Sequence, residues 1–332
     1  MLMQTILITG GAGFIGSNIA AELCARGTHR IVVCDVLGSG DKWRNLRKHP
    51  IYEVIAPSNL FYWLDMFGSS LDAIVHMGAI SSTTETNVDL FLETNQTLST
   101  LLYRWCAESG KRFIYASSAA TYGNGTQGFE DDASLAALNS LRPLNPYGWS
   151  KHLVDRYIAT ALELGETAPP QSAGLKFFNV YGPNEYHKED QRSVVRVKFD
   201  DALAGKTVKL FKSYRADYHN GGQKRDFIYV KDCVNVVLWL LDNPGVSGLF
   251  NVGTGKARTF DELARALFAA LGKQPSIDFF DMPETLRDKY QYFTEARMDR
   301  LRKAGYTAAF TSLEDGVRNY VQNYLLKDDP YL

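Results

Sequence analysis

The sequence predicts an α/β protein with a doubly wound parallel sheet and a smaller, discontinuous C-terminal region. Three observations lead to this prediction. A glycine-rich turn joins an apolar strand to a helix at the start of the chain, further apolar strands alternate with helices, and the sequence becomes polar and irregular from about residue 180. Such alternation is typical of parallel sheets, whose ligands bind beyond the carboxyl ends of the strands. We expect the sheet domain over residues 1–179 and the second region over 180–332, with some of it crossing back to the sheet.

The first strand and turn form the clearest motif. The apolar strand Thr5–Thr9 runs into Gly10-Gly-Ala-Gly-Phe-Ile-Gly16, and a helix pattern follows. Gly10, Gly13 and Gly16 allow a sharp turn, the close approach of a pyrophosphate, and close packing of the helix on the strand. The N-terminus of the helix offers free N–H groups to a phosphate. The motif predicts a dinucleotide-binding turn of the Rossmann type; an ordinary glycine turn in another parallel α/β protein is the alternative.

A second apolar strand, Ile31–Asp35, ends in an acid about twenty residues after the glycine turn. A carboxylate at this place can bond the ribose of an adenosine. Asp35 alone favours NAD, whereas Lys42 and Arg44 could neutralise the 2′-phosphate of NADP. We predict NADP as the cofactor, with NAD possible.

Further elements continue the alternation. Buried strands are expected at Leu71–Ala79, Arg112–Ala116 and Gly174–Pro183, and helices at Asp89–Ser109 and from Asn145 to about Leu164. Two more helices begin at capping motifs, a full capping box at Thr259 and Glu262 and a weaker one at Ser312 and Asp315.

Composition limits the classes of function. Apolar residues make up 45% of the 332, and 36 basic residues balance 37 acidic ones, so the overall charge favours neither nucleic acid nor anionic lipid as a partner. The chain has no apolar run near the roughly 20 residues that cross a bilayer. Small molecules are the expected partners and the cytoplasm the expected location. Cys24, Cys34, Cys106 and Cys233 show no C-x-x-C spacing and are expected to be reduced core residues; no metal site is predicted.

Tyr147 and Lys151 are the sharpest candidates for chemistry, because four residues of helix place them on one face. A tyrosine that acts as a base at pH 7 needs its pKa lowered by about three units, or about 4 kcal/mol. Lys151 and an oxidised nicotinamide ring could supply the positive charge, and Ser118 could bond the same substrate oxygen. The alternative is that Tyr147 caps a surface helix and Ser118 satisfies a strand end.

Together these motifs resemble the extended short-chain dehydrogenase/reductases, a family of nucleotide-sugar epimerases and dehydratases, over essentially the whole chain. Less common stretches narrow the resemblance to family members that epimerise ADP-linked heptoses. These stretches are residues Gly78–Glu85, Ala116–Gly123, Phe178–Lys188, Lys224–Val230 and Tyr290–Thr294. The resemblance also implies a homo-oligomer.

The resemblance implies a reaction without net oxidation. C6 of the heptose is oxidised by a tightly held nicotinamide cofactor, the ketone reorients, and hydride returns to the opposite face. A second acid/base is then needed, and the family's lysine falls on Lys188, next to His187. Burial near cations would lower the pKa of such a lysine. Without the resemblance, Lys188 is an ordinary exposed loop cation.

The resemblance also assigns contacts by position. Cofactor contacts are implied for Gly10, Gly13, Phe14, Ile15, Gly16, Asp35, Val36, Lys42, Met77, Gly78, Ala79, Ser81, Asn95, Lys151, Val180 and Lys188. Substrate contacts are implied for Ser118, Asn179, Phe211, Arg225 and Tyr290, where the planar fork of the arginine suits a diphosphate. Core roles for Met77 and Val180 and a surface ion pair for Arg225 are the alternatives.

Three stretches depart from the family pattern. Val36 replaces a polar residue that helps to select the cofactor, Glu189–Arg192 is more charged than expected, and the loop Tyr214–Gln223 is longer. An epimerase or dehydratase of a UDP-, GDP- or dTDP-sugar is the nearest alternative function. A non-catalytic, cofactor-sensing regulator is a more distant one, because such a protein would be expected to lose the set formed by Tyr147, Lys151 and Ser118.

Overall fold

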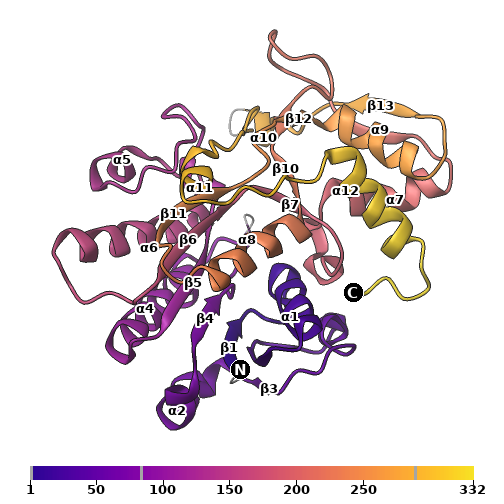
Figure 1. The fold of residues 1–332 in the computed structure, drawn as a ribbon. Coiled ribbons are helices and arrows are strands. Elements are labelled where there is room, and N and C mark those ends of the chain that lie inside the picture. The colour runs from indigo at the N-terminus through magenta and orange to yellow at the C-terminus, as the bar shows by residue number, and fades with distance from the viewer. Residues whose placement is uncertain (1–2, 83–84, 288–289) are drawn as a thin grey trace.

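A seven-stranded parallel sheet forms the centre of the computed structural model, which describes residues 3–82, 85–287 and 290–332 (Figure 1). Its strand order is β11-β6-β5-β4-β1-β2-β3, and all neighbouring strands are parallel. The strands are β1 Gln4–Thr9, β2 His29–Cys34, β3 Glu53–Ile55, β4 Ala73–His76, β5 Arg112–Ser118, β6 Ser172–Phe177 and β11 Gly248–Val252. The order reverses between β1 and β4, as in a doubly wound sheet, so the predicted fold class is confirmed.

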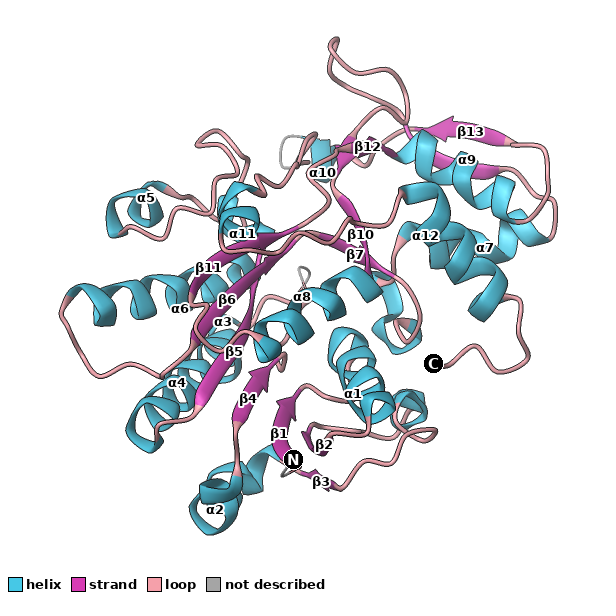
Figure 2. Ribbon diagram, viewed as in Figure 1, coloured by secondary structure: helices cyan, strands magenta, loops and turns pink. Residues whose placement is uncertain are grey.

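Helices cover both faces of the sheet (Figure 2). Alternate residues of β1 point to opposite faces: Ile6 packs in one core with α1 (Phe14–Arg26) and α8 (Val230–Asp242), and Leu7 packs in another with α4 (Leu98–Ser109) and α6 (Pro146–Glu163). Because both faces are buried, the central strands are apolar throughout rather than alternating.

The predicted helix at 89–109 contains an irregularity. It consists of α3 (Val88–Phe91), a π-helical turn (Leu92–Thr97) and α4, which ends at Gly110 in a left-handed conformation. The predicted helix after Asn145 is α6, and the Asn145 side chain accepts a hydrogen bond from the Gly148 N–H as its cap. Both helices are confirmed, whereas nothing in the sequence pattern indicated the π-helical turn.

The second region is built from small sheets and a separate core. Its strands pair as β7 (Asn179–Tyr181) with β10 (Phe227–Tyr229), β8 (Val208–Phe211) with β13 (Ile277–Phe280), and β9 (Lys224–Arg225) with β12 (Arg258–Thr259). Helices α7 (Val194–Leu203), α9 (Phe260–Ala270) and α12 (Leu313–Tyr320) share a core, and the caps at Thr259 and Ser312 are formed. The strand predicted at 174–183 is divided into β6 and β7, which belong to different sheets. Helix α8 and strand β11, although they follow residue 180, pack on or belong to the large sheet. The division of the chain into two domains at residue 180 stays a prediction.

Shorter elements complete the chain. They are η1 Asp41–Asn45, η2 Pro57–Asn59, α2 Leu60–Phe67, η3 Gly68–Ser70, η5 Ala119–Tyr122, α5 Leu135–Ser140, η6 Tyr186–Gln191, α10 Glu284–Arg287, α11 Asp299–Lys303 and η7 Val321–Leu325. All four cysteines are free; three are buried as predicted, but Cys24 is only half-buried. Among the described residues, no helix combines the length and the apolar character needed to cross a membrane.

Candidate active site

A cavity of about 490 Å³ lies beyond the carboxyl ends of β1, β4 and β5, at the point where the strand order reverses. The glycine turn, the first turn of α6 and the η6 segment also border it. The predicted residues that line it are Gly10, Gly13, Phe14, Ile15, Gly16, Asp35, Lys42, Met77, Gly78, Ala79, Ser81, Ser118, Tyr147, Lys151, Val180 and Lys188. Residues that lie far apart in the sequence, from Gly10 to Gln191, therefore meet at one site.

The glycine turn leaves no room for side chains. A Cβ on Gly16 would lie 2.2 Å from the carbonyl oxygen of Gly10, and a Cβ on Gly10, where φ is +63°, would lie 2.6 Å from the Cα of Gly78. The N-cap of α1 is Gly13, which offers no capping side chain. The first N–H groups of α1 are therefore open to an anion in the cavity, which fits the diphosphate of a dinucleotide.

Asp35 and Lys42 form an ion pair at the edge of the cavity. The Lys42 Nζ lies 2.6 Å from Asp35 Oδ1, and the Asp35 carboxylate also accepts hydrogen bonds from the backbone N–H groups of Ala12 and Val36 at 2.9 and 2.7 Å. Val36 does not line the main cavity: its side chain is 65% exposed and borders a shallower hollow beside Asp35. This hollow also borders Asp35, and the expected contact of Val36 with the cofactor stays a prediction.

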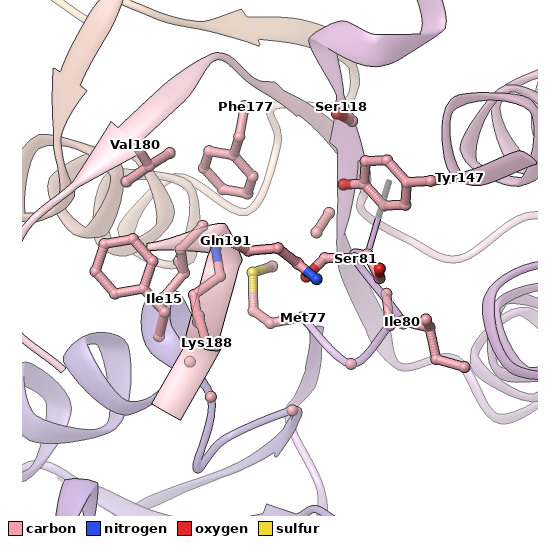
Figure 3. A pocket seen from close by; sticks show the side chains of 18 of the residues that line it. Ile15, Met77, Ile80, Ser81, Ser118, Tyr147, Phe177, Val180, Lys188 and Gln191 are labelled. Atoms are coloured by element: carbon pink, nitrogen blue, oxygen red, sulfur yellow. The ribbon is translucent and has the colours of Figure 1, made fainter. Parts of the chain in front are cut away.

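Asn95 also lies outside the cavity, but it supports the cavity wall. The fully buried side chain accepts a hydrogen bond from the Ile80 N–H at 2.8 Å and donates to the Ile80 carbonyl at 2.9 Å and to Ser150 Oγ at 3.0 Å. It thus fixes the loop after β4. Ser81 in that loop donates a hydrogen bond to Gln191 Oε1 at 3.0 Å (Figure 3). Thr83 and Thr84 of the same motif lie outside the described residues.

Tyr147, Lys151 and Ser118 come together as predicted. The Tyr147 ring enters the cavity from the first turn of α6, with its hydroxyl directed inward (Figure 3). Burial raises the pKa of Tyr147, and a hydrogen bond with Ser118 opposes this rise. Lys151, one turn later, donates to the Ala116 carbonyl at 2.8 Å, and burial lowers its pKa to about 8. The protein alone therefore does not produce the lowered pKa that Tyr147 needs as a base.

Lys188 enters the cavity from the side opposite Tyr147 (Figure 3). Its Nζ lies 5.3 Å from the centre of the Phe14 ring, and burial lowers its pKa, against the opposing charge of Glu185. The neighbouring Glu189 has a φ of +49°, which is unusual for a residue with a side chain. Lys188 is half-buried and lines the cavity, so it is not the exposed loop cation of the alternative interpretation.

The remaining predicted substrate residues do not line this cavity. Phe211, Arg225 and Tyr290 form a separate cluster, in which the Arg225 guanidinium lies 5.3 Å from the Tyr290 ring centre and the Phe211 and Tyr290 rings are 6.0 Å apart. Arg225 is only 8% exposed, so it is not the surface residue of the alternative interpretation. Asn179 is exposed at the start of β7, beside Val180 of the cavity wall.

Sequence reasoning missed several residues of the site. Gln191, Ile80 and Phe177 line the cavity, although no role was predicted for them; Ile80 and Gln191 lie in stretches that the sequence singled out for other reasons. Below the site, the buried pair of Asp155 and Lys176 is joined at 2.7 Å, and Asp155 accepts a hydrogen bond from Ser117 at 2.7 Å. The sequence did contain an indication of Asp155, because it follows Lys151 by four residues and therefore lies on the same face of α6.

Comparison with known proteins identifies the family to which the sequence is similar. A profile of the NAD dependent epimerase/dehydratase family matches residues 6–253. The ADP-L-glycero-D-manno-heptose-6-epimerase of Nitratidesulfovibrio vulgaris (strain DP4) is 50% identical over 329 residues, covering 98% of this chain and 99% of that protein. The protein of the same name from Fusobacterium nucleatum is 45% identical and covers 98% and 100% of the two chains.

Solved structures resemble the fold over its whole length. The crystal structure of the Helicobacter pylori ADP-L-glycero-D-manno-heptose-6-epimerase is 30% identical, with a TM-score of 0.80 and coverage of 97% and 96%. The Thermus thermophilus UDP-glucose 4-epimerase in complex with NAD is 26% identical, with a TM-score of 0.73 and coverage of 96% and 98%. With its Rossmann sheet, its glycine turn and its matches along both regions, this chain belongs to the NAD dependent epimerase/dehydratase family.

Proposed function

We propose that the protein is an epimerase that interconverts ADP-D-glycero-β-D-manno-heptose and ADP-L-glycero-β-D-manno-heptose at C6. The observation that carries this proposal is the placement of Tyr147 and Lys188, two titratable groups on opposite sides of one cavity (Figure 3). The names of the relatives at 50% and 45% identity support the choice of sugar. An enzyme for a UDP-, GDP- or dTDP-sugar is the alternative that the experiment below separates.

The cavity fits a nicotinamide dinucleotide. The glycine turn and the N-terminus of α1 would hold its diphosphate, Asp35 and Lys42 would hold the adenosine ribose, and the wall from Met77 to Ala79 would lie along the other half. When bound, the cofactor supplies a hydride acceptor in one direction and a hydride donor in the other.

Two acid/base groups are needed because the C6 hydroxyl has a different direction in each epimer. We assign Tyr147 Oη to the removal and return of the hydroxyl proton in one epimer, and Lys188 Nζ to the same task in the other. Ser118 bonds Tyr147 and stands ready to bond the substrate oxygen. Lys151 keeps a positive charge below pH 8 and favours the phenolate of Tyr147.

The function is tested by incubating the purified protein with ADP-D-glycero-β-D-manno-heptose and following the C6 epimer ratio by NMR. We expect wild type to equilibrate the epimers, and Tyr147→Phe and Lys188→Met each to reduce the rate at least 100-fold, because each removes a general acid/base. Lys209→Met, which changes an exposed lysine on β8, is the matched control and should keep the wild-type rate.

A wild-type protein that forms no epimer, even with NADP or NAD added, would refute the heptose assignment. The UDP-, GDP- and dTDP-sugars would then be tested in the same way. Turnover of none of them would favour the cofactor-sensing regulator.

We also propose that NADP is preferred over NAD. Lys42 lies 2.6 Å from the Asp35 carboxylate and neutralises the negative charge that would otherwise repel a 2′-phosphate beside it. Lys42→Ala should therefore weaken the binding of NADP at least 10-fold and change NAD binding much less, as measured by calorimetry on cofactor-free protein. Lys206→Ala, at an exposed lysine remote from the cavity, is the control. Equal losses for both cofactors would contradict the proposal. The cytoplasmic location and the homo-oligomer stay predictions.

A further inference from the structure

Residues Asp329–Leu332, here called the C-terminal strap, lie against the basic segment that follows β2. Asp329 forms ion pairs with Arg47 at 2.8 Å and Lys48 at 3.0 Å. The Lys48 Nζ also donates a hydrogen bond to the Tyr331 carbonyl at 2.6 Å, and the Arg44 guanidinium lies 4.8 Å from the centre of the Tyr331 ring. Arg44, Arg47 and Lys48 therefore all contact the strap.

The other side of the strap contacts the segment that carries Lys188. The Tyr186 hydroxyl donates to the Pro330 carbonyl at 2.8 Å, and the rings of Tyr186 and Tyr331 meet edge to face at 5.1 Å. The Leu332 N–H donates to Asn184 Oδ1 at 3.0 Å. In Figure 1 the yellow segment after α12 accordingly ends beside α1.

The strap thus joins two segments that border the cavity. One is η1, which carries Lys42, and the other is η6, which carries Lys188. Asn45 connects them at the glycine turn, because its side chain donates to the Ala12 carbonyl at 2.8 Å and to the Asn184 carbonyl at 3.3 Å.

The backbone around Lys188 needs such support. Asn184 and Glu189, on either side of Lys188, have φ values of +72° and +49°. Asparagine adopts a positive φ more readily than most residues, but a glutamate in this conformation persists only where surrounding contacts hold it there. The strap supplies contacts to Asn184 directly and to η6 through Tyr186.

We propose that the strap is a positioning element that holds the Lys188 segment and η1 in place over the cofactor cavity. Each exposed ion pair contributes little by itself. Tyr331, which is 8% exposed and packed between Arg44 and Tyr186, is its anchor. The effect on turnover rests on the proposed epimerase function, whereas the effect on the segments themselves does not.

The first experiment measures amide hydrogen exchange in the full chain without ligand. Tyr331→Ala should raise exchange at least 10-fold in residues 41–49 and 184–192 and leave β5 unchanged, while Tyr331→Phe keeps the ring and should match wild type. A variant that lacks Asp329–Leu332 should show the larger effect. The control is Asp242→Asn, which breaks an exposed ion pair with Arg26 at 2.9 Å at the other end of α1.

The second experiment measures cofactor release and epimerisation in the same variants. Tyr331→Ala should release the bound nicotinamide cofactor at least 5-fold faster and lower kcat at least 5-fold, with an unchanged KM for the ADP-heptose, because the Arg225 cluster is not touched. Tyr331→Phe, which keeps the ring, should show the wild-type rate of cofactor release and the wild-type kcat.

Wild-type exchange in both segments of the Tyr331→Ala and strap-deletion variants would overturn the proposal, whatever the activity. Raised exchange with unchanged cofactor release and kcat would overturn the positioning role. A wild-type protein that epimerises no heptose would refute the proposed function alone, since exchange and cofactor release still decide the role of the strap.

Discussion

His76 shows how one buried residue makes the stability of the fold depend on pH. It ends β4 directly before Met77, its Nδ1 lies 2.6 Å from Thr9 Oγ1, and its Nε2 lies 2.7 Å from Ser99 Oγ. Burial, with a contribution from the charge of Lys151, lowers its pKa to about 3. The folded protein therefore holds His76 neutral at pH values where the unfolded chain protonates it.

This linkage predicts a loss of stability in acid. Between pH 6.5 and 3 the unfolded state binds the additional proton, so the free energy of unfolding falls as the pH falls. From pH 7 to pH 5 the contribution of His76 is about 2 kcal/mol. Urea unfolding of His76→Gln should show a fall smaller by about this amount than wild type. His219→Gln, at an exposed histidine, should keep the wild-type fall; an equal fall in His76→Gln would contradict the assignment.

For single residues, the spacing along the sequence predicted those features that depend on one helix or one turn. Tyr147 and Lys151 share a helical face because they are four apart, and the glycines of the turn are set by backbone contacts of 2.2 and 2.6 Å. The position of Arg225 could not be deduced in this way, since it depends on the pairing of β9 with β12, in which Arg225 lies opposite Arg258. The raised pKa of Tyr147 likewise follows from burial, which spacing does not reveal.

Helix α6 is fixed to the sheet by a buried ion pair. Lys176 on β6 lies 2.7 Å from Asp155 on α6 and also donates a hydrogen bond to Thr121 in η5 at 2.5 Å. Asp155 accepts further hydrogen bonds from Ser117 and Tyr115 on β5. The pair therefore connects the elements that carry Ser118, Tyr147 and Lys151.

Removing one partner should be costly. Lys176→Met leaves the buried Asp155 carboxyl without its cation, and we expect a loss of about 3–5 kcal/mol in the free energy of unfolding. Adding Asp155→Asn to that variant should recover part of the loss, because no unpaired charge then remains. Arg265→Met, which breaks an ion pair with Asp261 on the surface of α9, is the control and should cost less than about 1 kcal/mol. Denaturant unfolding measures all three, and a small effect of Lys176→Met would refute the role of the pair.

At the scale of elements, the differences from the sequence prediction have local causes. The π-helical turn at 92–97 contains Asn95, whose side chain is fully buried and bonded to Ile80, a contact between distant segments that helical periodicity cannot indicate. The sequence from Gly174 to Pro183 did not reveal the division into β6 and β7, because the two strands differ mainly in their partners: β6 pairs with β5 and β11, whereas β7 pairs with β10.

For the whole molecule, the parallel sheet was predictable because each strand and the helix after it are neighbours in sequence. The second region was less so. Its two-stranded sheets join segments as far apart as β8 and β13, and the sequence does not indicate which of these segments pair. The same is true of the C-terminal strap, whose partners, Arg47 and Lys48, lie near the other end of the described chain.

The close contact of Gly10, Gly16 and Gly78 also bears on how such a protein can diverge. A Cβ on Gly10 or Gly16 would overlap the backbone of another of these glycines, so neither position tolerates a change by itself. The Phe211, Arg225 and Tyr290 cluster, made of side chains on separate small sheets and loops, is free of that restriction. We therefore expect related proteins to keep Gly10 and Gly16, and to differ in substrate specificity through changes at the Phe211, Arg225 and Tyr290 cluster.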